Sequence, residues 1–231
     1  MKEIKVKVFR SEAGFREYDV PYTERMRILD LLFYIQRNLE GSLAFRWNCR
    51  EGICGSCAMR VNGRPVLACK EEVKGNEITV EPLKVFPVVK DLVTDRAEIY
   101  IKEKTLQLHF IGEKSGGFYK ISEAEIKRAS EFRKCIDCLI CHDVCHANRE
   151  KLDYTGPRNL VKVMAQQLHP RNTLDRVPLL EGAGVNFCNV TRCCQQVCPQ
   201  EIHITTNGII PLKEAFISEK GLIARLLGRN K

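Results

Sequence analysis

Twelve cysteines lie in three groups of four, and this grouping limits what the chain can fold into more than any other feature of the sequence. The groups span residues 49–69, 135–145 and 188–198. A chain so rich in cysteine is typically either a secreted disulfide framework or a metal-binding protein. The N-terminal residues MKEIKVKVFRSEAGF lack the apolar stretch of a signal peptide, and no segment approaches the roughly 20 apolar residues of a membrane span. We therefore expect reduced, metal-binding thiols in a cytosolic protein.

The first group has the spacing C-x4-C-x2-C followed by a more distant cysteine, which is typical of plant-type [2Fe-2S] sites. Its members are Cys49, Cys54, Cys57 and Cys69. Gly52 and Gly55 suit a loop that wraps a cluster, because such a loop needs unusual φ angles and close approach of backbone N–H groups to sulfur. Zinc is the alternative for any four cysteines, but zinc sites usually use paired C-x2-C knuckles, so this spacing favours iron.

The second group has the C-x2-C-x2-C-x3-C spacing of bacterial ferredoxins. It consists of Cys135, Cys138, Cys141 and Cys145. In two-cluster ferredoxins the fourth cysteine of such a run binds the other cluster. The spacing therefore predicts a [4Fe-4S] cluster held by Cys135, Cys138, Cys141 and Cys198.

The third group departs from that spacing at one position. Counting back from Cys198, the run requires cysteines at 194, 191 and 188, but residue 191 is threonine. Three thiolates remain for the second site, which predicts a [3Fe-4S] cluster held by Cys145, Cys188 and Cys194. Cys193 is left over. In a helix it would point away from its neighbour Cys194, whereas a local distortion that brought it in would give a four-iron site instead.

Two histidines and the net charge bear on other functions. His142 and His146 flank the cysteine runs and could bind iron or relay protons, but such histidines more often form hydrogen bonds or face solvent. The net charge of +8 does not indicate nucleic-acid binding, because acidic and basic residues are interspersed and no basic stripe stands out.

Hydrophobic patterning divides the chain into an α+β part and a helical part. In residues 1–104, KEIKVKVFR and FREYDVPYT predict a hairpin that turns at Gly14, ERMRILDLLFYIQRNL predicts a helix, and CAMRVNGRPVLACK and EITVEPL predict three more strands. In residues 105–231, Ser122 and Glu125 form a capping-box pattern, and Pro157 lies near a helix start. Residues 208–228 predict a further helix, whose basic amphipathic end KGLIARLLGRNK suits either solvent or the surface of a membrane or a partner.

This order of motifs resembles the iron-sulfur subunit of succinate dehydrogenase and fumarate reductase, the complex II family, in a divergent prokaryotic branch. The resemblance rests on RWNCREGICGSCAMRVNGRPVLAC and EFRKCIDCLICHDVC, with GPRNL and NTLDR between the runs, and covers nearly the whole chain. It implies an α+β protein in which a plant-type ferredoxin (β-grasp) domain, residues 1–104, precedes an all-α bacterial-ferredoxin-like domain, residues 105–231.

The resemblance also implies a function and partners. The chain would be the electron-transfer subunit of a succinate:quinone oxidoreductase, with no catalytic residue or substrate site of its own. Its partners would be a flavoprotein that exchanges a hydride between succinate and FAD, and anchor subunits that bind quinone and, in some members, haem b. The chain would lie on the cytoplasmic face of the cell membrane, held there by the anchor, and no nucleic-acid partner is expected.

Two positions depart from the better-known members of this family. In those proteins Pro and then a quinone-binding Trp follow the cysteine that matches Cys145, and His follows the cysteine that matches Cys188. This chain has CHANRE and Asn189 instead. The alternative function is therefore that of the iron-sulfur subunit in a soluble thiol-linked fumarate reductase or a heterodisulfide-reductase-like complex. A zinc-stabilised binding module is the alternative from another class.

Overall fold

The computed structural model describes residues 3–112, 118–151 and 153–219. The chain forms two compact units. The first contains the residues up to Arg96 together with Ile136–Val144, and the second contains Ala97–Cys135 and the chain from Cys145 onward. The chain therefore leaves the first unit, returns to it for nine residues, and leaves it again.

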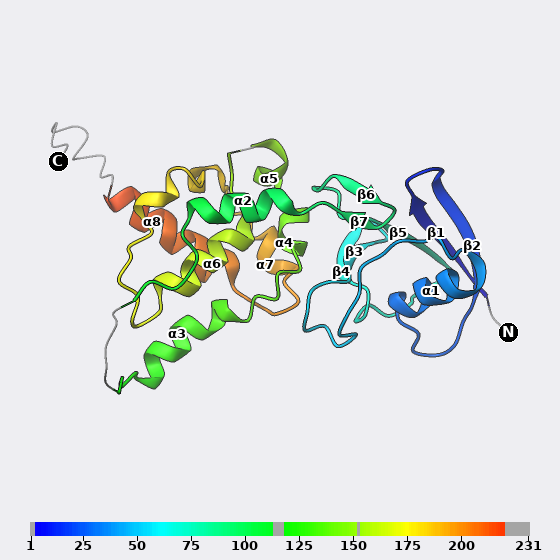
Figure 1. The fold of residues 1–231 in the computed structure, drawn as a ribbon, viewed down its shortest axis with the longest axis horizontal. Helices are drawn as coiled ribbons and strands as arrows, with labels where there is room; N and C mark the ends of the chain where they lie inside the picture. Colours follow the sequence, from blue (N-terminus) through cyan, green and yellow to red (C-terminus); the bar gives the residue numbers. More distant parts are fainter. Residues whose placement is uncertain (1–2, 113–117, 152, 220–231) are drawn as a thin grey trace. The chain divides into compact units, whose positions relative to one another are not determined.

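A five-stranded mixed sheet forms the frame of the first unit (Figure 1). Its strands are β1 (Glu3–Arg10), β2 (Gly14–Pro21), β3 (Ala58–Val61), β4 (Arg64–Leu67) and β5 (Glu77–Glu81), in the order β2-β1-β5-β3-β4. β1 pairs antiparallel with β2 and parallel with β5. Side chains alternate between the two faces of a strand, and Ile4, Val6 and Val8 of β1 are accordingly fully buried in the core.

One helix and a short hairpin complete the first unit. Helix α1 (Ile28–Tyr34) lies beside the sheet and continues into a π-helical turn, Ile35–Leu39. The predicted hairpin at Gly14 and the helix that follows it are thus confirmed. Strands β6 (Val88–Lys90) and β7 (Val93–Thr94) form a second, two-stranded sheet that the sequence patterns did not predict.

The nine-residue segment Ile136–Val144 belongs to the core of the first unit. It contains the short helix α4 (Ile140–Asp143), and the carboxylate of Asp143 is fully buried. Arg60 of β3 donates a hydrogen bond to this carboxylate, and the backbone N–H of Lys84 donates another at 2.6 Å. A buried carboxylate is stable only when it is paired in this way, so these contacts hold the segment in the first unit.

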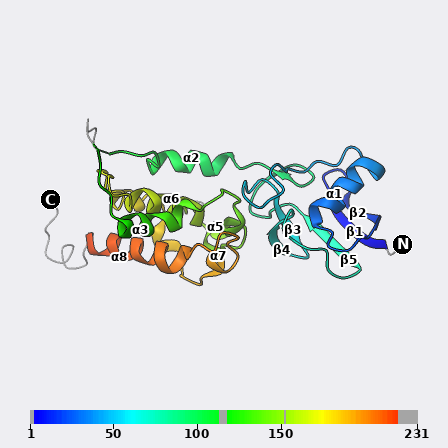
Figure 2. The same cartoon turned by 90° about the horizontal axis from the view of Figure 1, so that it is seen from below.

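The second unit is helical. Its helices are α2 (Ala97–Thr105), α3 (Glu123–Arg133), α5 (His146–Glu150), α6 (Pro157–Gln167), α7 (Cys193–Gln196) and α8 (Ile210–Glu219), with short 3-10 turns at Pro178–Leu180 and Val185–Phe187 and a π-helical turn at Ile204–Ile209. Helix α3 packs against α6 (Figure 2). The Ser122 hydroxyl accepts a hydrogen bond from Glu125 N, and Pro157 is the first residue of α6, so both predicted helix starts are confirmed. The basic end of the predicted C-terminal helix, residues 220–231, lies outside the described residues.

Two buried arginines explain the sequence motifs GPRNL and NTLDR. Arg158 of α6 pairs with Glu103 of α2. Arg176 is fully buried and donates hydrogen bonds to the backbone carbonyls of Gln107 and His109 at 3.0 and 2.8 Å. Both side chains therefore hold the chain around α2 to the rest of the unit, which is a structural task.

Candidate metal centres

The first centre lies within the first unit, where one thiol is already surrounded by hydrogen-bond donors. The Cys49 sulfur accepts the backbone N–H groups of Glu51, Ile53 and Cys54, each at 3.4 Å. These donors, with the side chain of Cys54, lower the pKa of Cys49 to about 6, the largest effect coming from Glu51. A thiolate held by backbone N–H groups at neutral pH is the form that ligates iron.

The other three cysteines of this group lie near one another: Cys54 neighbours both Cys49 and Cys57, and Cys57 neighbours Cys69. Cys57 and Cys69 are buried, and burial raises the pKa of Cys57 to about 12, helped by the adjacent thiols of Cys69 and Cys54. Buried thiolates of like charge need a compensating cation, which an iron cluster supplies. The donor set at this loop therefore fits a [2Fe-2S] cluster.

Left-handed backbone shapes the loop around Cys49. Arg50, Gly52 and Gly55 have φ angles of +60°, +73° and +69°. Successive turns of this kind point several N–H groups inward, which explains the three donors at one sulfur. Gly55 is also packed closely: a side chain there would meet the carbonyl of Ile136 and lie 2.8 Å from Cys138 N.

The cysteines predicted to hold the [4Fe-4S] cluster are distributed over both units. Cys138 and Cys141 are buried in the segment Ile136–Val144 of the first unit, whereas Cys135 and Cys198 belong to the second. Leu139, which follows Cys138, has a left-handed φ of +65° and immediately precedes α4. This ligand set remains a prediction.

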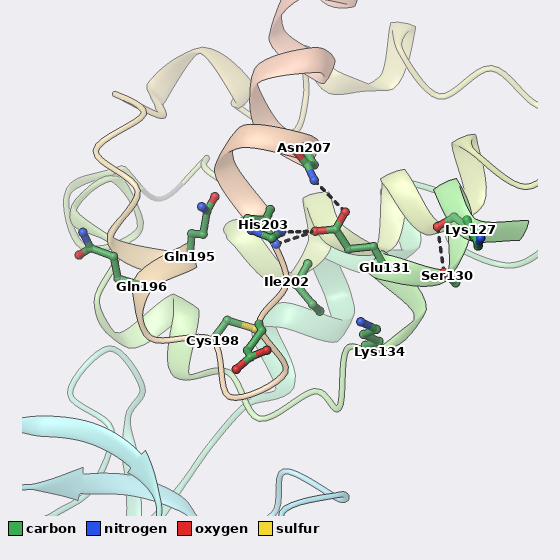
Figure 3. Close-up of a pocket in the computed structure, with 11 residues that line it drawn as sticks. Lys127, Ser130, Glu131, Lys134, Gln195, Gln196, Cys198, Ile202, His203 and Asn207 are labelled. Atoms are coloured by element: carbon green, nitrogen blue, oxygen red, sulfur yellow. Dashed lines mark hydrogen bonds and ion pairs between the residues drawn. The ribbon is translucent and has the colours of Figure 1, made fainter. Parts of the chain in front are cut away.

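Cys198 lines an open cavity of the second unit with a volume of about 890 Å³ (Figure 3). Its wall is largely polar, and the Glu131 carboxylate contacts two other residues of this wall, His203 and Asn207. One carboxylate oxygen of Glu131 lies 2.8 Å from His203 N and 2.9 Å from His203 Nδ1, and the other accepts Asn207 Nδ2 at 2.9 Å. Although burial acts in the opposite direction, these donors hold the pKa of Glu131 below its ordinary value. The carboxylate therefore carries a negative charge and links α3 to the chain after Cys198.

The third centre is a small cavity in the second unit. It is lined by the three predicted ligands, Cys145, Cys188 and Cys194, and also by Thr191 and Cys193. Cys145 precedes α5, Cys188 follows the turn Val185–Phe187, and Cys194 lies in the first turn of α7. The fold thus brings together residues more than forty positions apart in the sequence, as the spacing predicts.

The electrostatics of this cavity also fit a metal cluster. Burial raises the pKa of Cys145 to about 11 and that of Cys194 to about 12, and the neighbouring thiols of Cys193 and Cys188 act in the same direction. The hydroxyl of Thr205 lies 3.3 Å from the Cys194 sulfur and opposes this rise. Such thiols would lose their protons only to a strongly positive ligand, and iron is one.

Cys193 does not point away from the cavity, so that expectation is wrong. Val190 and Arg192 have φ angles of +53° and +62°, and the helix begins only at Cys193 itself. Because the chain turns sharply just before α7, the side chains of both adjacent cysteines line the same space. The Thr191 hydroxyl lies 3.6 Å from the Cys193 sulfur.

The two histidines occupy different surroundings. His142 is 1% exposed and stacks on Phe86, with ring centroids 6.3 Å apart. His146 lines the third cavity. Sequence reasoning missed three other contacts of the ligand loops: Thr205, the backbone donors at Cys49, and Lys213, whose Nζ lies 2.5 Å from the Cys188 carbonyl. Of these three, only the backbone donors at Cys49 had a sequence signal, the glycines near that residue.

The described residues offer neither a preformed site for a single metal ion nor a membrane span. They contain no group of three or more His, Cys, Asp or Glu residues placed to hold a metal ion. No helix among residues 3–112, 118–151 and 153–219 is both long and apolar enough to cross a membrane.

A known protein family, a curated relative and a solved structure are similar to this chain. Residues 3–101 match the family described as "2Fe-2S iron-sulfur cluster binding domain". The fumarate reductase iron-sulfur subunit of Mycobacterium tuberculosis is 34% identical over 202 residues, which cover 83% of this chain and 82% of that protein. A chain of the Mycobacterium smegmatis Sdh1 complex in the apo form superposes with a TM-score of 0.90 at 36% identity, covering 94% of this chain and 97% of that one.

Longer relatives match as well. One of the subunits of the fumarate reductase (CoM/CoB) of Methanothermobacter marburgensis is 34% identical over 216 residues. The alignment covers 91% of this chain, but the chain spans only 44% of the length of that relative.

Proposed function

Because the chain belongs to the family of iron-sulfur subunits of fumarate reductase and succinate dehydrogenase, we propose that it conducts electrons between a flavoprotein and a membrane quinone. The family is defined by its iron-sulfur centres, [2Fe-2S], [4Fe-4S] and [3Fe-4S]. When bound, such clusters accept and release one electron at a time, which links the two-electron chemistry of a flavin to that of a quinone. The observation that best supports the proposal is that three backbone N–H groups donate to the Cys49 sulfur in the matched [2Fe-2S] domain.

We assign the cluster ligands as follows. The [2Fe-2S] cluster is held by Cys49, Cys54, Cys57 and Cys69. The [4Fe-4S] cluster is held by Cys135, Cys138, Cys141 and Cys198. The [3Fe-4S] cluster is held by Cys145, Cys188 and Cys194. The protein's own contribution is to bind these clusters, to donate hydrogen bonds to their sulfur ligands and to bury half of the twelve cysteines, all of which set the potential of each cluster.

The proposed partners supply the remaining chemistry. A flavoprotein carries FAD and the succinate site, anchor subunits carry the quinone site, and this chain has no substrate site of its own. The chain is then peripheral to the membrane, on its cytoplasmic face. The 36% identity to a chain of the Sdh1 complex supports this arrangement.

The proposal is tested on the complex that copurifies with the chain from detergent-solubilised membranes. Succinate added without oxygen is expected to reduce the clusters, seen by EPR, and the complex is expected to reduce a water-soluble quinone. Cys49→Ser is expected to lower the rate at least about tenfold, because the first ligand set is damaged. Ser42→Ala is a matched control, because Ser42 belongs to the same unit but lies outside the ligand loop. A complex whose clusters succinate cannot reduce contradicts the proposal.

A second candidate is the iron-sulfur subunit of a thiol-linked fumarate reductase. The observation in its favour is the 34% identity to the relative from the fumarate reductase (CoM/CoB). The two candidates differ in the electron donor for fumarate. If fumarate reduction by the purified complex depends on a pair of thiols and quinols are inactive, the second candidate is correct.

A further inference from the structure

The third centre holds one thiol more than its predicted cluster needs. Three cysteines are assigned to iron there, yet Cys193 lines the same cavity. Its sulfur lies 3.6 Å from the hydroxyl of Thr191, which lines that cavity too. Its sulfur is therefore within the group of thiols and is not directed away from it.

The position of Cys193 in the sequence makes its presence in this group of thiols unusual. A four-iron site of the bacterial type would take its fourth thiolate from position 191, where this chain has threonine. Thr191 is exposed and lies at the rim of the cavity. Its hydroxyl approaches the Cys193 sulfur at 3.6 Å, so the threonine and the additional thiol share one corner of the site.

We propose that Cys193 is the ligand of a fourth, exchangeable iron at the third centre, which makes the cluster convertible between three-iron and four-iron forms. The inference rests on the proposed assignment of Cys145, Cys188 and Cys194 to a [3Fe-4S] cluster. The ligand that the corner takes up is a ferrous ion. Cys193 is only partly buried, so solvent reaches it.

The conversion requires one electron and one ferrous ion. One electron, which succinate supplies through the flavoprotein, brings the three-iron core to its neutral state. That core takes up one ferrous ion and becomes the dicationic four-iron core, with no further electron transfer. A bond forms between the new iron and the Cys193 sulfur, and the thiol proton passes to water. Loss of the ferrous ion reverses the step, and the sulfur is protonated again.

The conversion would change the reduction potential of the third centre. In the three-iron form the Cys193 sulfur would hold no iron, whereas in the four-iron form its thiolate would be a ligand. The additional ligand changes the charge of the centre, and charge is one of the factors that set a cluster potential. Availability of ferrous iron would therefore adjust electron transfer at this centre.

The test uses the purified complex and measures iron directly. The complex is reduced with dithionite without oxygen, incubated with ferrous iron enriched in the Mössbauer-active isotope and desalted. It is then examined by Mössbauer spectroscopy and by EPR, first in the reduced state, which shows the [2Fe-2S] signal, and again after mild reoxidation without oxygen, which restores the signal of any remaining three-iron cluster. In the wild type we expect the three-iron EPR signal to disappear and about one labelled iron per chain to appear with the Mössbauer parameters of a four-iron cluster. Cys193→Ser is expected to keep the three-iron signal and to bind at least about tenfold less labelled iron.

Thr191→Val is the matched control, because it removes the hydroxyl at the same corner and keeps the thiol. It is expected to take up iron like the wild type. Uptake that is unchanged in Cys193→Ser, absent in the wild type, or abolished by Thr191→Val overturns the inference. The [2Fe-2S] signal, recorded in the same samples, verifies that each variant has folded.

A wrong assignment of Cys145, Cys188 and Cys194 as cluster ligands would give a different result from a wrong role of Cys193. If Cys145→Ser has the same EPR spectra as the wild type, and neither protein shows a three-iron or converted four-iron signal, then the ligand assignment itself is wrong. If Cys145→Ser removes the three-iron signal but the wild type takes up no iron, only the role of Cys193 is wrong.

Discussion

Two buried carboxylates, those of Asp143 and Asp91, link distant parts of the first unit. Asp143 fixes the segment Ile136–Val144 through Arg60 and Lys84 N. Asp91, which is 2% exposed, accepts hydrogen bonds from Ala44 N, Ser11 N and Arg10 Nε at 2.9, 3.0 and 3.1 Å. Neither role can be read from the sequence, because each partner is more than forty residues away and no spacing rule connects them.

Asp143→Ala is expected to lower the free energy of unfolding by about 3–5 kcal/mol, because it removes the fully buried anion that the partly buried Arg60 guanidinium and Lys84 N both contact. Asp143→Asn keeps the shape and an acceptor for Lys84 N, so we expect a smaller loss of about 1–3 kcal/mol. Chemical denaturation followed by circular dichroism measures both. Equal stability of the alanine variant and the wild type would show that the ion pair does not hold the segment.

Asp91 is expected to make stability depend on pH. Burial alone would raise its pKa, but the N–H groups of Ala44 and Ser11 and then the Arg10 guanidinium hold the pKa below the ordinary value of 3.8. A carboxyl with a lowered pKa stabilises the fold above its unfolded-state pKa, and this contribution is lost as the pH falls through the folded-state pKa. Asp91→Asn is therefore expected to lower the free energy of unfolding by about 1–3 kcal/mol at pH 7. The difference from the wild type should narrow below pH 3.8, and denaturation curves over this pH range check it; a constant difference contradicts the assignment.

Among the elements, those with local signals were predictable and those held by distant contacts were not. Alternation in β1, the turn at Gly14, the capping box at Ser122 and the proline of α6 each depend on a few neighbouring residues. The return of Ile136–Val144 to the first unit depends on side chains from β3 and the chain after β5. Similarly, the cysteine spacing predicted which thiols meet at the third centre, but the left-handed turn that brings in Cys193 has no sequence signature.

Gly14 and Gly55 have nearly the same backbone conformation but differ in how closely they are packed, so their substitution distinguishes the cost of backbone strain from the cost of steric overlap. Gly14 has a φ of +70° with open space around it, whereas a side chain at Gly55, with a φ of +69°, would meet Ile136 O and Cys138 N. Gly14→Ala is expected to cost only the left-handed strain, about 1–2 kcal/mol. Gly55→Ala is expected to cost about 1–3 kcal/mol more, because the segment must move. Thermal unfolding of both variants measures the difference, and equal losses would mean that the close approach at Gly55 is unimportant.

At the scale of the whole molecule, the three ligand sets share no cysteine. With the proposed clusters, the chain should bind about nine iron ions and show a brown colour, whereas a zinc protein would be colourless. Cys69→Ser is expected to remove the [2Fe-2S] EPR signal and about two of the irons, while the signals of the other two clusters remain. Iron analysis with EPR of the anaerobically purified complex measures this. Simultaneous loss of all three signals would show that the centres depend on one another.

The return of the segment Ile136–Val144 also has a consequence for biosynthesis. Chains are made from the N-terminus at about 5–20 residues per second, and N-terminal domains usually fold before later ones emerge. Here the first unit lacks the carboxylate partner of Arg60 until residue 143 has left the ribosome. A nascent chain halted after Arg96 therefore contains the whole sheet and all four cysteines of the first group, yet Arg60 has no buried anion to meet. Completion of the N-terminal unit is thus coupled to synthesis of the first ligands of the second cysteine group.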